Sequence, residues 1–198
     1  MISPDEAERL VGVRLKERIL IAIDGRPVSG KSTLAMRLAD RFNLPMLCID
    51  DFMAPERDWM SRAPGFPYPF FRNAVFVDAV HTLKREGRCT YTEFDWEAVE
   101  IGTKERILIW DGPLIVEGCS VLQEPLPGLY DLRFFIESDE ASTYAAAMAR
   151  DGERWALEWR TIFLPSVVLY METNPRARAD HVVAGRGVSS RFNDVARD

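Results

Sequence analysis

Residues 25–32 carry the strongest chemical signal in the sequence. They read Gly25-x-x-x-x-Gly30-Lys31-Ser32, the phosphate-binding pattern G-x-x-x-x-G-K-[ST]. Glycines let the backbone turn its N–H groups toward a phosphate, and the helix expected after Gly30 adds its positive dipole end. Lys31 supplies positive charge for the β- and γ-phosphates, and the Ser32 hydroxyl can ligate Mg²⁺. The pattern predicts a nucleoside-triphosphate site made of Gly25, Val28, Ser29, Gly30, Lys31, Ser32 and Thr33.

Two adjacent carboxylates, Asp50 and Asp51, follow the next apolar run along the chain. In open α/β sheets, ligands bind at the carboxyl ends of the strands. An alcohol that attacks a γ-phosphate needs a base in line with the phosphorus atom. Either Asp50 or Asp51 could serve as this base. The competing interpretation is that the pair is a helix cap with a solvated neighbour.

The elements that must position these residues follow from the hydrophobic pattern. Short apolar runs typical of buried parallel strands lie at Ile19–Ile23, Leu44–Ile49, Leu132–Ile136 and Ala179–Val183. Two further apolar runs, Ile107–Trp110 and Leu114–Val116, flank the turn sequence Asp111-Gly112-Pro113. Strands that alternate with helices predict a parallel sheet covered on both faces.

Helical spacing of apolar residues occurs between these runs, and several helix ends can be placed. Ser3 should cap a first helix that reaches about Glu17, and Ser138 should cap a later one. Gly87 should close the helix that contains Val80, and Pro165 should break or kink the last helix. The proline-rich, aromatic segment Met53–Asn73 is aperiodic and predicts a long structured loop.

Bulk composition limits the classes of function. The chain has 198 residues, 47% of them hydrophobic, which suits one domain over residues 1–198. The net charge of -6 argues against a nucleic-acid partner, and no apolar run reaches membrane-spanning length. Three cysteines without C-x-x-C spacing favour reduced thiols, so we expect a cytoplasmic protein. A homo-oligomer is left open.

The chain resembles the uridine kinase-like branch of P-loop kinases, which is related to phosphoribulokinase and bacterial pantothenate kinase. Between about Arg18 and Arg186, the resemblance rests on five ordered stretches: "DGRPVSGKST", "CIDDFM", "EFDW", "LIVEGCSVL" and "ARD…RADHVVAGRG". It implies the P-loop kinase fold, an α/β fold with a five-stranded parallel sheet, helices on both faces and a short lid. It also implies ATP and Mg²⁺ as cofactors and transfer of the γ-phosphate to a hydroxyl of a small molecule.

The resemblance also implies roles for individual residues. The family's "D-x-F-Y" falls on residues 50–53, which assigns catalysis to Asp50, although Met53 replaces the tyrosine. The stretch "LIVEG" places Glu117 near Mg²⁺, whereas Asp111, followed at once by Gly-Pro, suits a turn. Arg150 matches the lid arginine that acts on the γ-phosphate.

The match to the family is weaker at two further positions, one in the lid and one in the nucleotide site. Ala147 stands where the family shows a second arginine in the lid. Arg186 falls where the family packs adenine.

The acceptor site departs from uridine kinases. Phe94 and Asp95 lie in the base-reading stretch, but its tyrosine and histidine are absent, which speaks against uridine. Asn73 falls near the family's ribose-binding aspartate, and Arg72 is one of the arginines of the long loop. The candidate substrate-binding residues are therefore Asp50, Arg72, Asn73, Phe94 and Asp95. We interpret the aromatic residues of the long loop as packing rather than a recognition site: Trp59, Phe66, Tyr68, Phe70 and Phe71.

The sequence leaves alternative functions open. A regulatory ATP- or GTP-binding module would use the same phosphate loop without an acceptor. A nucleotide hydrolase would release phosphate without an added alcohol. The sequence lacks an N-K-x-D guanine signature, and Gln123 follows the wrong element to position a water molecule.

Overall fold

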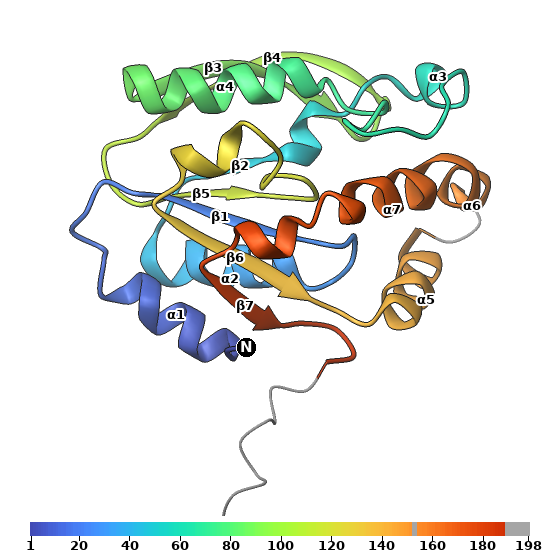
Figure 1. The fold of residues 1–198 in the computed structure, drawn as a ribbon. Coiled ribbons are helices and arrows are strands. Elements are labelled where there is room, and N and C mark those ends of the chain that lie inside the picture. The colour runs from blue at the N-terminus through green and yellow to red at the C-terminus, as the bar shows by residue number, and fades with distance from the viewer. Residues whose placement is uncertain (152–153, 189–198) are drawn as a thin grey trace, which may run out of the picture.

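The computed structural model describes residues 1–151 and 154–188, with the side chain of residue 151 left out. Its main sheet has five parallel strands in the order β2-β5-β1-β6-β7. Figure 1 shows this sheet between two layers of helices. The strands are β1 (Leu20–Gly25), β2 (Met46–Cys48), β5 (Leu114–Glu117), β6 (Leu132–Glu137) and β7 (His181–Ala184). The predicted α/β fold with a five-stranded parallel sheet is confirmed.

The two faces of the sheet are covered by different helices. On one face, Ile21 and Ile23 of β1 pack with α1 (Pro4–Gly12) and α2 (Lys31–Phe42). On the other, Leu20 and Ala22 belong to the core that holds α4 (Asn73–Glu86) and α7 (Leu164–Glu172). Successive side chains of a strand point to opposite faces, so a strand covered on both sides must be apolar throughout. All six residues of β1 are buried.

The remaining helical elements are short, apart from α5. They are the 3-10 turns η1 (Ile49–Phe52), η2 (Leu126–Leu129) and η4 (Pro175–Arg178), the helices α3 (Glu56–Trp59), α5 (Glu140–Asp151) and α6 (Ala156–Glu158), and the π-helical turn η3 (Trp159–Phe163). The π turn directly precedes α7, where Pro165 occupies the first helical turn and needs no N–H donor. The expected irregularity at Pro165 is therefore present.

A second, antiparallel sheet was missed in the sequence. It is the hairpin of β3 (Arg88–Asp95) and β4 (Glu100–Ile109), and it includes most of the apolar run 107–110. In β4, Leu108 is buried while Ile107 and Ile109 are 65% and 59% exposed. That alternation is typical of a strand with one solvated face rather than of a strand inside a parallel sheet.

Some predicted boundaries were wrong. The first helix ends at Gly12, not near Glu17, and the chain continues in turns. The second strand is shorter than predicted, because the chain turns into η1 at Ile49, so Asp50 lies in a 3-10 turn. Ser138 is not the cap of α5: the Asp139 carboxylate accepts the N–H of Ser142 at 2.7 Å. Within the described residues, the buried Ser138 hydroxyl has no hydrogen-bond partner.

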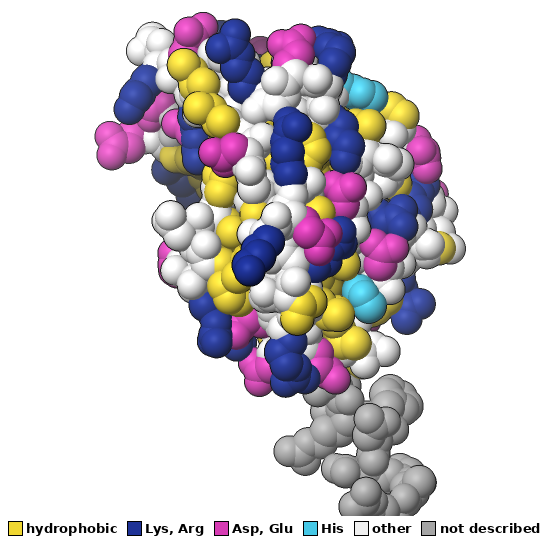
Figure 2. All heavy atoms as spheres, turned by 90° about the vertical axis from the view of Figure 1, so that its left-hand side faces the viewer, with side chains coloured by type: hydrophobic (Ala, Val, Ile, Leu, Met, Phe, Trp, Pro, Cys, Tyr) yellow, Lys and Arg dark blue, Asp and Glu magenta, His cyan; other side chains and the backbone are white. Residues whose placement is uncertain are grey.

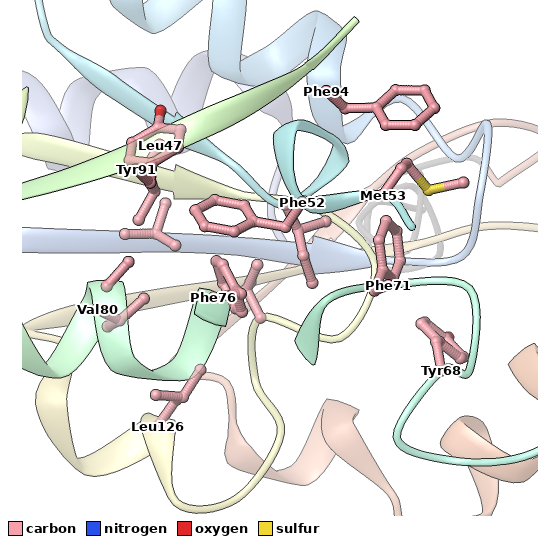
Figure 3. Packing of buried hydrophobic residues seen from close by; sticks show 14 of the residues in the cluster. Leu47, Phe52, Met53, Tyr68, Phe71, Phe76, Val80, Tyr91, Phe94 and Leu126 are labelled. Atoms are coloured by element: carbon pink, nitrogen blue, oxygen red, sulfur yellow. The ribbon is translucent and has the colours of Figure 1, made fainter. Parts of the chain in front are cut away.

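The larger core joins the sheet to the hairpin and α4. Figure 3 shows Phe52 of η1 between Phe76 of α4 and Tyr91 of β3. The ring centroids of Phe52 lie 5.4 Å from Phe76 and 4.7 Å from Tyr91. These contacts fix η1 by its apolar residues and leave its two aspartates to point elsewhere.

The face shown in Figure 2, on the side of the molecule away from α5 and α6, intersperses positive and negative side chains. The structure contains surface ion pairs: Lys84 lies 3.1 Å from Asp131, and Arg133 lies 2.6 Å from Asp180. Along residues 1–151 and 154–188, no helix combines the length and apolar character needed to cross a bilayer.

Candidate active site

The phosphate loop lies between the central strand β1 and helix α2, as predicted. Gly25 has φ of +153°, and a Cβ there would lie 2.7 Å from the carbonyl oxygen of Ile136. Gly30 has φ of +108°, and a Cβ there would meet no atom within 4 Å, so its backbone faces open space. Val28 also adopts a positive φ of 57°, which is strained for a β-branched residue. Loops that hold phosphate by backbone N–H groups use such angles.

Arg186 supports this loop from outside. Its Nε donates to the carbonyl of Val28 at 2.9 Å, and its backbone N–H donates to the carbonyl of Ser29 at 2.9 Å. Among the described residues, the buried Ser29 hydroxyl has no partner. Gly30, Lys31, Ser32 and Thr33 line the cavity at the start of α2, so the loop fits a phosphate ligand.

Lys31, Ser32 and Glu117 meet at the start of α2. The Ser32 hydroxyl donates to Glu117 Oε1 at 3.0 Å, and Lys31 Nζ lies 3.9 Å from the same oxygen. Burial alone would lower the pKa of Lys31. The Cys119 sulfur and the carboxylates of Glu117 and Asp50 outweigh burial, so the pKa lies above its ordinary value. Lys31 is therefore a buried, fully charged ammonium.

The same residues fit a magnesium ion. Mg²⁺ prefers oxygen ligands and usually keeps several waters when it binds with phosphates. The Ser32 hydroxyl and the Glu117 carboxylate, 3.0 Å apart, supply two such oxygens beside the loop. Over the part of the chain that the structure describes, no cluster of three or more His, Cys, Asp or Glu side chains could hold a metal alone. An ion here would depend on phosphate oxygens.

Asp24, the residue before the loop, was not singled out in the sequence. It is completely buried and accepts the N–H groups of Gly25 at 2.6 Å and Leu122 at 2.7 Å. It also accepts from the hydroxyl of Tyr170 on α7. Burial raises the pKa of Asp24, and the hydrogen bonds from Tyr170 and the backbone act against that rise. In the sequence, the only sign of this role was a single aspartate at the end of an apolar run.

Asp50 and Asp51 point into different surroundings. Asp50 lies at the cavity above the phosphate loop, and its charge acts on Lys31. Asp51 Oδ2 accepts from the Tyr91 hydroxyl at 3.0 Å and lies 3.5 Å from Arg106. Asp51 is thus held by the β3–β4 hairpin and is not among the residues that line the cavity.

The cavity has a volume of about 550 Å³, within the range of small-molecule sites. Its floor is the phosphate loop and the start of α2, with Lys31 and Ser32. Arg150, near the end of α5, and Arg186 lie at its border. Residues 152–153, which follow Arg150 in the lid stretch, lie outside the described residues.

Comparison with known proteins points to one fold. No family model matches the chain, and no curated protein matches it. A solved structure of a possible uridine kinase from Bacillus stearothermophilus matches with a TM-score of 0.71 and 18% identity, covering 91% of this chain and 96% of that one. A candidate fructose transport system kinase from Silicibacter sp. TM1040 matches at a TM-score of 0.60 and 25% identity, covering 92% and 99%.

Phosphoribulokinase from Rhodobacter spheroides also matches, at a TM-score of 0.60 and 13% identity, covering 88% of this chain and 72% of that one. The chain has the fold of the uridine kinase-like P-loop kinases. The resemblance expected from the five sequence stretches is thereby confirmed at the level of the fold.

Not every predicted residue lies at the cavity of this P-loop kinase fold. Arg72 donates to the carbonyls of Met53, Asp51 and Thr92 at 2.7–3.1 Å. Asn73 accepts from Gln123 at 2.9 Å. These contacts hold the long loop and the start of α4, and neither side chain lines the cavity.

The two candidates in the hairpin are also absent from the cavity lining. The Asp95 carboxylate accepts the N–H groups of Glu97 and Ala98 at 2.9 and 3.0 Å, which closes the turn after β3. Phe94 is buried next to Trp96, with ring centroids 5.0 Å apart. Trp96 reaches the cavity instead.

The sequence analysis did not predict the aromatic lining of the cavity. Of the five aromatic residues in the long loop, all but Phe66 line the cavity as well as packing in the core. Figure 3 shows three of the lining residues, Met53, Tyr68 and Phe71, at one end of that core. We use the name aromatic wall for the eight aromatic side chains that line the cavity: Trp59, Tyr68, Phe70, Phe71, Trp96, Trp155, Trp159 and Phe163.

Proposed function

We propose that the protein is an ATP-dependent kinase that transfers the γ-phosphate to a hydroxyl of a small molecule. The observation that carries the proposal is the placement of Asp50 and Lys31 at one cavity, with Asp51 facing elsewhere. A base and a phosphate-binding cation at one cavity are what phosphoryl transfer to an alcohol requires.

In the proposed reaction, Asp50 accepts the proton of the acceptor hydroxyl. The hydroxyl oxygen forms a bond to the γ-phosphorus, and the bond from that phosphorus to the β–γ bridging oxygen breaks. The products are the phosphate ester and ADP. The loop amides and Lys31 hold the phosphates, and Arg150 would neutralise charge that develops on the γ-phosphoryl group.

Ser32 and Glu117 would hold Mg²⁺, directly or through water. The ion supplies positive charge between the β- and γ-phosphates. Arg186 would keep the loop in shape through its bonds to Val28 and Ser29 and border the adenine. These assignments support a nucleoside triphosphate as the phosphate donor, and the family resemblance implies ATP.

The experiment compares two neighbouring variants. The protein is incubated with Mg·ATP and a panel of alcohols, and the phosphate ester and ADP are measured together. Asp50→Asn should lower kcat by about 100-fold or more, the range that general-base catalysis contributes, with the Kd of ATP unchanged. Asp51→Asn is the matched control and should retain most of the activity. Equal activity of Asp50→Asn and the wild type would refute the assignment of the base.

The same assay addresses the competing functions. ATP binding without turnover in the presence of any alcohol would favour a regulatory nucleotide-binding module. Phosphate release that is independent of added alcohol would favour a hydrolase.

A further inference from the structure

The aromatic wall lines much of the cavity that holds Asp50. Its members come from three parts of the chain: the loop between η1 and α4, the turn of the β3–β4 hairpin, and the segment 155–163. The phosphate loop lines the same cavity. A molecule bound beside Asp50 in this cavity would therefore have aromatic rings among its neighbours.

The wall is preformed because its rings brace one another. Phe70 lies 4.7 Å from Phe163 and 5.1 Å from Tyr68, measured between ring centroids. Trp59 lies 5.4 Å from Phe163 and 5.8 Å from Trp155. Edge-to-face and offset contacts at these distances stabilise an aromatic pair more than the burial of its surface area alone would.

The wall offers few hydrogen-bonding groups to an acceptor. The indole N–H of Trp59 donates to the carbonyl of Ala54, and that of Trp155 donates to Glu56. The Tyr68 hydroxyl is buried, so the cavity meets the ring rather than the oxygen. Cys119 also lines the cavity, and sulfur is only a weak hydrogen-bonding group.

From this arrangement, and resting on the proposed function, we infer that the acceptor is an alcohol with a flat, mostly apolar body, such as a hydroxymethyl group on an aromatic ring. Asp50 would receive its single reacting hydroxyl, while the ring stacks on the aromatic wall. A sugar or a nucleoside would place several further hydroxyl or base-edge groups against rings. Each polar group buried without a partner weakens binding.

The test uses alcohols that differ in the group that carries the hydroxyl, which is either aromatic or polar. Benzyl alcohol and 2-naphthalenemethanol are compared with glycerol, D-ribose and uridine, each with Mg·ATP, by ester and ADP formation. Binding is measured separately by calorimetry with the same probes and a non-hydrolysable ATP analogue. We expect the aromatic alcohols to give a kcat/KM at least tenfold higher than the others, and the lower Kd.

The outcomes separate this inference from the function on which it rests. If glycerol, ribose or uridine is the preferred acceptor, the inference is wrong and the kinase function stands. If the aromatic alcohols bind but no alcohol is phosphorylated, the kinase function fails. If the aromatic alcohols neither bind nor react, the apolar acceptor is excluded.

A pair of variants tests the wall itself. Trp96 is 44% exposed, so Trp96→Ala should leave the fold intact. It should weaken binding of 2-naphthalenemethanol about threefold to tenfold, as expected for one lost aromatic contact, with the Kd of ATP unchanged. Trp96→Phe should restore most of the affinity. Ile107→Ala, an exposed site on β4 outside the cavity, is the control and should have no effect. Equal affinity in Trp96→Ala and wild type would contradict the inference.

Discussion

At the scale of single residues, the neighbours Asp50 and Asp51 differ in what surrounds them. Asp50 lies at the cavity, whereas Asp51 is half-buried beneath the hairpin beside Tyr91 and Arg106. Burial raises the pKa of Asp51 to about 6, with smaller effects of Tyr91, Glu93 and Arg106. One aspartate is thus placed for chemistry and the other joins two parts of the fold.

The pKa of Asp51 predicts a pH dependence of stability. Because the folded state binds this proton more tightly than the unfolded state, the contribution of Asp51 is most favourable below pH 4 and is lost as the pH rises to about 6. The free energy of unfolding of the wild type, relative to Asp51→Asn, should therefore fall between pH 4 and pH 7. Urea unfolding of both proteins across this range measures the difference. A difference that stays constant or grows with pH would contradict the shift.

The sequence predicted individual residues well where a motif fixes their neighbours. The loop pattern located Lys31 and Ser32, and the structure places both beside Glu117. Arg72 and Asn73 stay predictions as ligand contacts, because a side chain near a binding loop can equally hold that loop together, as both do here. Tertiary packing decides whether such a side chain contacts a ligand or the loop, and the spacing of residues along the chain does not reveal this packing.

At the scale of elements, β2 and β5 end very close together. Gly118 follows β5 with φ of +145°, and a Cβ there would lie 2.1 Å from Cγ2 of Ile49. This close contact between Gly118 and Ile49 places the turn that contains Asp50 next to the end of β5, which contains Glu117. Only glycine allows both the backbone angle and the contact.

Gly118→Ala should therefore destabilise the protein by about 2 kcal/mol or more, through a positive φ and overpacking together. Thermal unfolding should show a melting temperature lower by about 4 °C or more, at about 2–4 °C per kcal/mol for a chain of this size. Gly112→Ala is the matched control, because a Cβ there meets no atom within 4 Å and φ is not positive. Equal loss in the two variants would show that the contact with Ile49 is unimportant.

The sequence predicted the buried parallel strands because continuous apolar runs are distinctive. It missed the hairpin because β4 begins with charged and small residues and has only one buried face. The aromatic wall was missed for a different reason. Its members lie up to about 100 positions apart and meet only when the segment 155–163 and the hairpin approach the long loop.

At the scale of the whole molecule, the phosphate loop predicts that nucleotide stabilises the fold. A ligand that binds only the folded state adds about 2.7 kcal/mol at a concentration 100 times its Kd. Mg·ATP should raise the melting temperature in proportion to the logarithm of its concentration. Removing Mg²⁺ with EDTA should reduce this shift if Ser32 and Glu117 hold the ion. Adenosine, which lacks phosphates, is the control. A shift of equal size with adenosine would locate the binding energy outside the loop.

The buried carboxylate of Asp24 has a consequence for how the molecule can move. One side chain bonds the first amide of the phosphate loop, the segment after β5, and the phenol of α7. Helix α7 directly continues the π turn that supplies Phe163 to the far wall of the cavity. Any displacement of α7 that withdraws Tyr170 leaves a buried carboxyl group short of one hydrogen-bond donor, at the start of the phosphate loop. Asp24 therefore links the phosphate loop to α7, and a movement of either element would change a hydrogen bond of the same carboxyl group.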